Sequence, residues 1–537
     1  MYACNREHPA DTALNYFGNR ISFGELFAQI DRAARAFLAL GVRPGDVVPI
    51  VSVSTVASVV CFYALNRIGA VVDFLNVLAE RDDLVKYLQE AEARVVVTLD
   101  LFGEKVVSAA RAVGAAHVVS VCVSYAMPLP TRAGYYLKAG RKKAPWQADP
   151  IVTDWRDFLK LGAGQPAVDY VKDPHTTCLL AHTGGTTGVP KAVMLSDCAM
   201  NTAALTYLQM MKNAERRDVF LQIMIPFVVY GILSCTHVPL CLGFCAVLIP
   251  KFDPAQWKNY LRRYRPNHIM AVPAYVSPLL KTETSDLSFI KNIAVGGDGM
   301  TMALEEEMNR LLRTKNSGAV LTKGYAMTEV CATAVASFTT VNKVGSVGIP
   351  LPKNNLMIYD NDTQTELPGG QVGEICLQSP SRMLGYRGDP EATKDLFRVH
   401  ADGSEWLHTG DLGYVDEDGF VYLQGRMKRV ILTVKDGVAY KVFPNMSEKV
   451  LDGHEAVLQS CIVGAVSGTD QVLRAYVAVA KTDMARTPEI ERDLRERCEQ
   501  SLPSYARPTF YTFREALPLT PAGKVDYRAL ETEAQNA

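Results

Sequence analysis

Residues 179–196, LLAHTGGTTGVPKAVMLS, decide the fold of this chain. Two short apolar runs enclose a loop that is rich in glycine and threonine and that ends in a lysine. Glycines allow backbone N–H groups to turn toward an anion, threonine hydroxyls add donors, and the lysine adds a positive charge. The pattern therefore predicts a phosphate site between two strands, built from Thr183, Gly184, Gly185, Thr186, Thr187, Gly188 and Lys191.

This loop differs from a Walker A motif, because no Lys-Ser or Lys-Thr pair follows Gly188 and no helix begins there. Instead, a second apolar strand should follow the lysine, and Ser196 should cap the helix after it. The alternative interpretation is a flexible polar loop between two strands. The order of the whole string argues against that alternative.

Helical and strand patterns alternate on both sides of the loop. Ser22 and Glu25 form a capping box that should open a helix through Leu40, and the apolar run 47–53 should form a strand. Repeated strand–helix–strand units predict an α/β fold with parallel-rich sheets covered by helices. After about residue 370 the pattern changes to short strands and D-G turns, which indicates a small β-barrel-like part.

The expected domain organisation follows from the length of the chain and from the change of its strand and helix pattern. A chain of 537 residues is too long for one compact core. We expect a large N-terminal domain, residues 1–425, and a small mobile α+β domain, residues 426–537, with the hinge near Lys428. The sequence DEDG at 416–419 resembles the start of a calcium loop, but the twelfth position is Met427 rather than glutamate, so a hairpin turn is the better interpretation.

Composition excludes several classes of protein. The net charge of −1 argues against a large basic surface for nucleic acid, so no nucleic-acid partner is expected. The twelve cysteines form no CxxC pair, and we interpret them as reduced, packed thiols of a cytoplasmic protein. The start of the chain has no apolar signal segment. Residues 219–250 lack charge, but their prolines and glycines favour strand, helix and strand in a core over a membrane span.

Further motifs appear in a fixed order after the loop. GYAMTE occupies 324–329, WLHTGDLG occupies 406–413, GRMKR occupies 425–429 and PAGKVDYRAL occupies 521–530. Together with the glycine-rich loop, they resemble the motifs of the acyl-adenylate-forming superfamily, which includes acyl-CoA synthetases, adenylation domains of peptide synthetases and luciferases. The resemblance covers nearly the whole chain, and the AVGGDGM string at 294–300 also resembles bacterial acyl-CoA synthetases.

The resemblance implies roles for individual residues. Tyr325 would stack on adenine, Thr328 would bond phosphate, and Glu329 would hold Mg²⁺. Asp411 would bind the ribose hydroxyls, Arg426 would bind ribose and phosphate, and Lys428 would be the hinge. Lys524 would donate to the acyl-phosphate oxygens. The nucleotide site would also include Gly297, Asp298 and Gly324. His408 stands where an arginine is common and receives no role.

The reaction explains why these residue types are needed. A carboxylate attacks the α-phosphate while pyrophosphate leaves, so negative charge accumulates between anionic groups. Catalysis then depends on positioning and positive charge, with Lys524, Thr328 and Glu329 as the catalytic residues. No acid–base histidine or activated serine is required for this step.

The acid should be hydrophobic. Amino-acid-activating relatives place an aspartate near position 228, but the run at 225–234 is IPFVVYGILS, and a buried ammonium without a partner is costly. Small and apolar residues favour a fatty or aryl acid bound by apolar burial. The expected acyl pocket consists of Val228, Tyr230, Ser234, Gly297, Ala326, Cys331 and Ala332.

The resulting expectation is an ATP-dependent acid–thiol ligase that uses ATP, Mg²⁺ and coenzyme A. One alternative loads an acyl carrier protein, and another ligates a bile or sterol acid to coenzyme A. A non-catalytic nucleotide-binding scaffold is the alternative of another class, although such a binder has no need of Lys524. The basic stretch at 132–146, RAGYYLKAGRKKAPW, is interpreted as a surface excursion with a weaker possibility of peripheral membrane contact.

Overall fold

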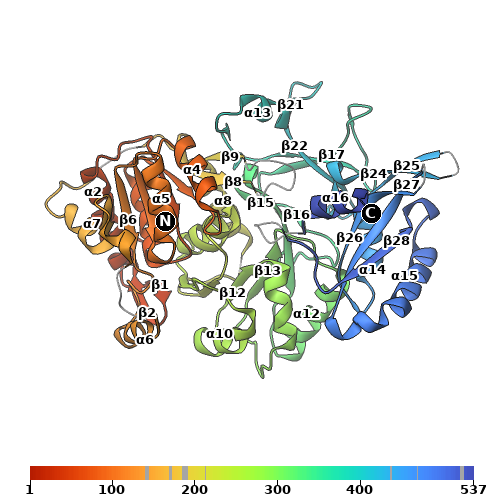
Figure 1. Cartoon of the computed structure of the whole chain (residues 1–537), viewed down its shortest axis with the longest axis horizontal. Coiled ribbons are helices and arrows are strands. Elements are labelled where there is room, and N and C mark those ends of the chain that lie inside the picture. Colours follow the sequence, from red (N-terminus) through yellow and green to blue (C-terminus); the bar gives the residue numbers. More distant parts are fainter. Residues whose placement is uncertain are drawn as a thin grey trace.

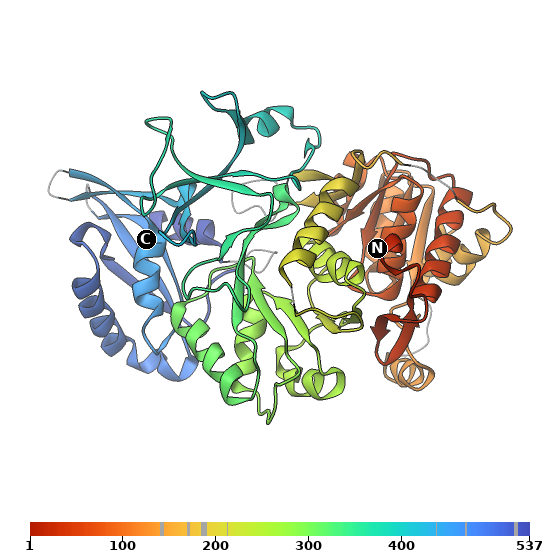
Figure 2. The same ribbon diagram turned by 180° about the vertical axis from the view of Figure 1, so that it is seen from behind.

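The computed structural model describes residues 1–139, 144–168, 172–183, 191–211, 213–435, 438–467, 470–519 and 525–536. Three bodies follow one another along the chain (Figure 1): an N-terminal α/β layer, a central α/β layer, and a C-terminal domain coloured blue. Turned by 180°, the molecule shows the same succession from the other side (Figure 2). No helix in the described ranges is long and apolar enough to cross a membrane.

The first sheet carries the glycine-rich loop. Its strands are parallel except at one edge, where β9 and β20 run antiparallel. In spatial order they are β20 (Gly385–Tyr386), β9 (Ala192–Ser196), β8 (Thr177–His182), β4 (Val71–Phe74), β3 (Val47–Val51), β5 (Val95–Leu99), β6 (His117–Val121) and β7 (Val152–Asp154). The helices of this region are α2 (Phe23–Ala39), α3 (Val56–Arg67), α4 (Arg81–Glu90), α5 (Gly103–Ala112), α6 (Leu129–Ala139) and α7 (Trp155–Leu161).

The two helix caps predicted for this region are confirmed. The capping box is present, because the Ser22 hydroxyl accepts from Glu25 N and the Glu25 carboxylate accepts from Ser22 N. The strand after the loop ends at Ser196, whose Oγ accepts from Ala199 N at 3.1 Å and caps α8 (Asp197–Met210). The basic stretch at 132–146 begins in helix α6.

The second sheet forms the central layer. Its spatial order is β16 (Ile349–Pro350), β15 (Ala332–Ala336), β14 (Leu321–Met327), β13 (Asn292–Gly296), β12 (His268–Ala271), β10 (Val219–Gln222), β11 (Cys245–Leu248), β1 (Thr12–Tyr16) and β2 (Asn19–Ser22). The helical segments here are the π-helix η3 (Tyr230–His237), α9 (Val238–Cys241), α10 (Trp257–Tyr264), α11 (Pro273–Val276) and α12 (Met302–Thr314). The uncharged segment 219–250 is thus strand, helix and strand in a core, as predicted.

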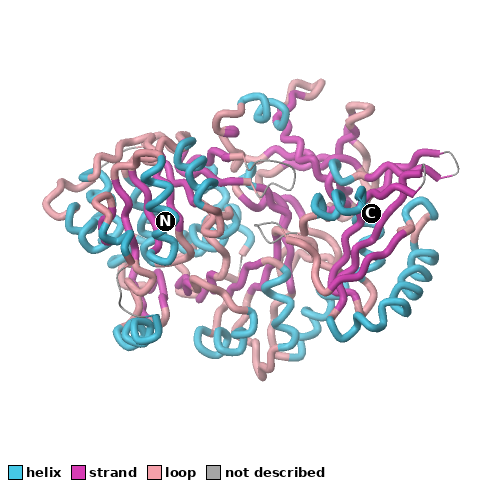
Figure 3. The backbone as a smooth tube through the Cα atoms, in the orientation of Figure 1, coloured by secondary structure: helices cyan, strands magenta, loops and turns pink. Residues whose placement is uncertain are grey.

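An antiparallel sheet follows, and Figure 3 draws its strands in magenta. It contains β17 (Asn355–Asp360), β18 (Thr365–Glu366), β19 (Gly373–Gln378), β21 (Phe397–Val399), β22 (Glu405–Val415) and β23 (Val421–Arg426), with helix α13 (Pro390–Leu396) beside it. β22 and β23 are joined by the D-G turn, so the hairpin interpretation of that turn is confirmed.

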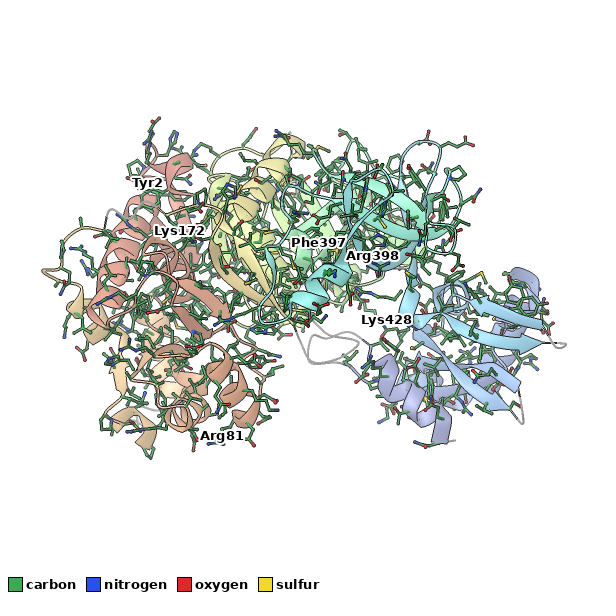
Figure 4. All side chains as sticks on the ribbon, turned by 90° about the horizontal axis from the view of Figure 1, so that it is seen from above. Tyr2, Arg81, Lys172, Phe397, Arg398 and Lys428 are labelled. Carbon is green, nitrogen blue, oxygen red and sulfur yellow. The ribbon has the colours of Figure 1, made fainter. Side chains whose placement is uncertain are left out.

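The C-terminal domain begins after the short helix η7 (Met427–Arg429). Its elements are β24 (Ile431–Lys435), β25 (Val438–Val442), α14 (Pro444–Asp452), β26 (Val457–Ser467), β27 (Asp470–Val479), α15 (Thr487–Ser501), β28 (Phe510–Arg514) and α16 (Tyr527–Asn536). Viewed from above, Lys428 lies where the ribbon passes from the large body to this α+β domain (Figure 4). The domain has its own buried cores, which include Val442, Ile462 and Leu494.

Candidate active site

A cavity of about 1840 Å³ is lined by residues of all three bodies. Most residues that the sequence predicted for the site belong to its lining: Thr183, Lys191, Val228, Tyr230, Gly297, Asp298, Gly324, Ala326, Thr328, Glu329, Ala332, Arg426 and Lys428. Four others are described but do not line it: Ser234, Tyr325, Cys331 and Asp411. The predicted residues Gly184, Gly185, Thr186, Thr187, Gly188 and Lys524 lie outside the described residues.

The base of the glycine-rich loop is a closed hairpin. Thr183 N donates to Lys191 O at 3.0 Å, and Lys191 N donates to the Thr183 hydroxyl at 3.1 Å. The Lys191 ammonium lies 4.6 Å from the centroid of the Tyr386 ring and 3.8 Å from a carboxylate oxygen of Asp389. These contacts hold a positive charge beside the loop at the cavity wall.

Glu329 lies just after the end of β14, in the short helix η6 (Thr328–Val330). Tyr386 OH donates to its Oε1 at 2.7 Å, and its backbone carbonyl accepts from Met383 N at 2.7 Å. Burial and the Glu329 carboxylate raise the pKa of Tyr386, so the phenol stays protonated and acts as the donor. An oriented carboxylate in a cavity wall fits Mg²⁺, which prefers oxygen ligands.

Asp411 is held between two partners from different elements. Tyr325 OH donates to Oδ2 at 2.6 Å, and Arg426 Nε donates to Oδ1 at 2.8 Å. Asp411 and Arg426 face each other across β22 and β23, which explains the short contact. Tyr325 therefore has its hydroxyl bonded to the Asp411 carboxylate. Its ring, predicted to stack on adenine, lies behind the cavity lining.

A second network beside Asp411, whose Glu374, His408 and Gly410 line the cavity, was not predicted. Glu374 accepts from Gly410 N at 2.8 Å through Oε1 and from Asn361 Nδ2 at 2.8 Å through Oε2. His408 Nδ1 lies 2.8 Å from the same Oε2, and its Nε2 lies 3.0 Å from His400 Nε2. Burial raises the pKa of Glu374, but its bonds to His408, Asn361 and Gly410 together hold that pKa below its usual value.

This network gives His408 a role that the sequence did not. Gly410 immediately precedes Asp411, so the bond from Gly410 N to Glu374 fixes the backbone that carries the Asp411 carboxylate. Cys376 completes a group of three donors within 4.8 Å of one another, Sγ lying 3.5 Å from His408 Nδ1, which a metal ion could bridge. The hydrogen bonds already satisfy Glu374 and His408, so we interpret the group as a positioning network. The signal in the sequence was the histidine within the TGD motif.

One branch of the cavity runs along β13 and β14. Its floor consists of small residues on one face of the two strands: Ala294, Gly296, Thr322, Gly324 and Ala326. The cavity lining also contains tyrosine and methionine side chains: Tyr207, Met211, Met224, Tyr230 and Met270. Alternate residues of a strand face the same side, so this floor is a direct result of the sequence TKGYAM and NIAVG. We call this part of the cavity the channel; small and apolar side chains of this kind suit an apolar group.

Two residues predicted for the acyl pocket lie behind this channel. Ser234 is fully buried, with its hydroxyl 3.5 Å from Tyr207 OH, which in turn lies 2.6 Å from Thr333 Oγ1. Cys331 is fully buried and has a φ of +59°, and the channel residue Ala332 has a φ of +81°. Such left-handed backbone is uncommon outside glycine and turns the chain sharply from η6 into β15.

The family follows from comparison with known proteins. Residues 2–387 match the family model for AMP-binding enzymes, and residues 447–524 match the model for the AMP-binding enzyme C-terminal domain. The chain belongs to the AMP-binding enzyme family. The resemblance drawn from the motifs is thereby confirmed, and so is the expected fold with its small C-terminal α+β domain.

Curated relatives of this AMP-binding enzyme span nearly its whole length. The long-chain-fatty-acid–CoA ligase of Bacillus subtilis (strain 168) is 29% identical over 98% of this chain and 93% of the relative. The 4-coumarate–CoA ligase 5 of Oryza sativa subsp. japonica is 28% identical over 95% of this chain and 88% of the relative.

Solved structures show the same fold. ATP-bound MatB from Rhodopseudomonas palustris has a TM-score of 0.83 at 24% identity and covers 99% of this chain and 98% of its own. The anthranilate CoA ligase AuaEII with anthranoyl-AMP has a TM-score of 0.82 at 21% identity, covering 99% and 96%.

Proposed function

We propose that this AMP-binding enzyme is an ATP-dependent acyl-CoA synthetase that activates a hydrophobic fatty or aryl carboxylic acid. ATP and the acid give acyl-AMP and pyrophosphate, and coenzyme A then displaces AMP. The curated relatives, which are ligases that join long-chain fatty acids or 4-coumarate to coenzyme A, support this class. The observation that carries the proposal is one cavity that joins the Glu329 and Arg426 side chains to an apolar channel.

The first half-reaction uses the residues at the cavity centre. Glu329, oriented by Tyr386, is the residue that would hold Mg²⁺, which when bound would supply positive charge for the departure of pyrophosphate. Asp411 and Arg426 hold the ribose, with Thr328 at the α-phosphate. These contacts, with Lys524, act mainly by positioning and by stabilising charge that develops on the reacting oxygens.

The second half-reaction requires a change at the domain junction. Met427 and Lys428 line the cavity, and so does Leu519 near the end of the chain. We assign the domains to residues 1–425 and 426–537, with rotation about Lys428 exchanging one catalytic surface of the small domain for another. This rotation would remove Lys524 from the site before coenzyme A arrives.

The acid is assigned to the channel along β13 and β14. Its floor is small and the cavity lining also contains Met211, Met224 and Met270, whose flexible side chains adapt to apolar groups of different shape. A fatty acid gains about 0.8 kcal/mol for each methylene that the channel removes from water. A planar aryl acid would gain from the ring faces of Tyr207 and Tyr230.

The test measures pyrophosphate release over a panel of straight-chain, aryl and sterol acids, with and without coenzyme A, and identifies products by mass. Release that depends on a hydrophobic acid and a thioester product support the proposal. Vigorous turnover of a sterol acid alone would support the bile-acid alternative. Product that remains acyl-AMP until a carrier protein is added would favour the carrier-loading alternative.

The proposal also covers location and membrane contact. We place the enzyme in the cytoplasm with transient contact at a membrane surface through α6. Two large apolar side chains of this helix point outward, because Leu129 is 71% exposed and Leu137 is 89% exposed. Exposed leucines beside the basic segment fit an anionic lipid surface. Sedimentation with anionic vesicles, comparing the wild type with Leu137→Glu, tests this contact.

A further inference from the structure

A buried carboxylate and an imidazole meet at the edge of the first sheet. Asp73 Oδ1 lies 2.8 Å from His182 Nε2, and the side chains are 3% and 15% exposed. Asp73 comes from β4 and His182 is the last residue of β8, which are neighbouring parallel strands. Because parallel strands end at the same edge, the two side chains meet beside the cavity, where ligands of α/β sheets commonly bind.

The pair stands at the base of the glycine-rich loop. His182 directly precedes Thr183 and pairs with Ala192 across the β8–β9 hairpin. The Thr183 and Lys191 backbones close this hairpin, and His182, Thr183 and Lys191 all line the cavity. The position of the imidazole is therefore tied to that of the loop by the strand that carries both.

The surroundings favour a charged imidazole. Burial lowers the pKa of His182, but the charge and hydrogen bond of Asp73 and the charge of Glu90 raise it above its usual value. The ring of Tyr87 packs edge-on against the His182 ring, with the ring centroids 4.9 Å apart. Tyr87 belongs to α4, the helix that also carries Glu90, and Lys191 lies across the hairpin from His182. Two acidic groups and one distant cation thus face the ring.

The two ring nitrogens of His182 differ in their hydrogen bonding. Nε2 bonds Asp73, whereas Nδ1 is buried and has no hydrogen-bond partner among the residues that the structure describes. A buried donor without an acceptor costs about 1–3 kcal/mol, so this nitrogen is poised for an acceptor. An imidazolium held by a carboxylate at a phosphate loop can donate Nδ1–H to a phosphate oxygen.

We infer that His182, hydrogen-bonded to Asp73 and with its Nδ1 unpartnered among the described residues, binds the β- and γ-phosphates of ATP and the pyrophosphate that leaves. The inference rests on the proposed adenylation and adds a binding residue to it. During the reaction an acid oxygen bonds the α-phosphorus, and the bond from that phosphorus to the bridging oxygen breaks with its electron pair going to pyrophosphate. No proton has to move, so His182 keeps its proton and stabilises the leaving charge.

The experiment measures acid-dependent pyrophosphate release without coenzyme A across a range of pH, for the wild type, His182→Gln and Asp73→Asn. In the wild type, kcat/KM for ATP should fall as pH rises through the pKa of His182. Asp73→Asn removes the charge that raises this pKa, so the fall should move to lower pH. His182→Gln should abolish the pH-dependent fall and raise the KM for ATP about tenfold, which corresponds to one lost charge-assisted bond.

The matched control is His175→Gln, since His175 is an exposed histidine near the opposite end of β8. It should leave both the pH profile and the KM unchanged, and equilibrium binding of ATP to each purified variant separates binding from turnover. Wild-type KM and an unchanged pH profile in His182→Gln would overturn the inference. A defect confined to the thioester step would also overturn it, by showing that the imidazole serves the thiol. Absence of any acid-dependent release by the wild type would instead count against the proposed function.

Discussion

Tyr386 donates a hydrogen bond of 2.7 Å to Oε1 of Glu329, although 57 positions separate the two residues in the chain. The contact exists because β20, which ends at Tyr386, joins the first sheet beside β9, while Glu329 follows β14 of the second sheet. It therefore spans the two layers that enclose the cavity. The predicted magnesium ligand owes its orientation to this bond.

Tyr386→Phe should weaken the apparent affinity for Mg²⁺ by about tenfold, because a hydrogen bond to a charged group contributes about 1.5–3 kcal/mol. Acid-dependent pyrophosphate release, titrated with Mg²⁺ at saturating ATP, measures the change. Tyr414→Phe is the matched control, since its ring stacks on Tyr422 outside the cavity lining. An unchanged Mg²⁺ dependence in Tyr386→Phe would mean that Glu329 does not hold the metal.

Lys524→Ala should slow acyl-AMP formation by roughly two to three orders of magnitude, the loss expected when a donor to a developing oxyanion is removed. Thioester formation from supplied acyl-AMP should change much less. Single-turnover assays of each half-reaction measure the two rates, with the exposed Lys481→Ala as control. Equal losses in both half-reactions would contradict the use of two domain orientations.

Lys428→Pro should leave adenylation largely intact and abolish most thioester formation. Proline fixes φ and restricts the residue before it, so the backbone of η7 could no longer exchange between two conformations. The same two assays apply. Lys428→Ala is the control, because it removes the charge and keeps the backbone free. If Lys428→Ala loses thioester formation as the proline variant does, the loss is due to the side chain and not to the backbone pivot.

Enlarging the channel floor at two depths should shorten the preferred acid by different amounts. Ala326 and Ala294 lie on the same floor, with Ala294 beside Thr322, which is four residues and about 13 Å of strand from Ala326. Ala326→Leu should exclude all but short acids, whereas Ala294→Phe should exclude only long ones. Values of kcat/KM over a straight-chain series measure this order, and the KM for ATP should stay constant. The reverse order would place the carboxylate at the other end of the channel.

Asp218→Asn should destabilise the protein by about 2 kcal/mol near neutral pH, because it removes a buried carboxylate that is hydrogen-bonded to a partly exposed ammonium and to an imidazole. Asp218 lies 2.9 Å from His268 Nε2 and 2.9 Å from Lys291 Nζ. Burial raises the pKa of Asp218, but bonds from His268, Glu215 N and Lys291 hold it below its usual value.

The stabilisation from Asp218 is thus complete above the carboxyl's unfolded pKa and is lost as pH falls through its lowered folded pKa. Urea unfolding at a series of pH values should show wild type and Asp218→Asn converging in acid. Asp157→Asn, at an exposed carboxylate, should follow the wild type throughout. A constant difference at every pH would assign the effect to packing rather than charge.

Local sequence determined the secondary-structure elements and the motifs that resemble those of the family. The capping box at Ser22, the helix cap at Ser196 and the strand–loop–strand at 179–196 depend on contacts within a few residues, so their patterns could be interpreted directly. The charge-free segment 219–250 was assigned to a core for the same reason, because its prolines and glycines act on the adjacent backbone.

Tertiary structure decided which of the predicted residues reach the cavity. Cys331 directly precedes the lining residue Ala332, and Ser234 is four residues from the lining residue Tyr230, but neither side chain lines the cavity. Ser234 lies in the π-helix with its hydroxyl near Tyr207 OH, and Cys331 lies in left-handed backbone at the turn into β15. The spacing of residues in a motif determines neither the π-helical turn at Ser234 nor the left-handed backbone at Cys331. Side-chain direction there depends on packing between layers.

The partners of the site residues were also beyond the sequence. Tyr386 on Glu329, Glu374 on Gly410, and Asp73 on His182 are contacts between residues 36 to 109 positions apart. They form because strands distant in the chain become neighbours in a sheet or across two layers, and buried polar groups then find partners. The sequence determined the chemistry that the chain carries, and the packing of its sheets decided which groups hold that chemistry in position.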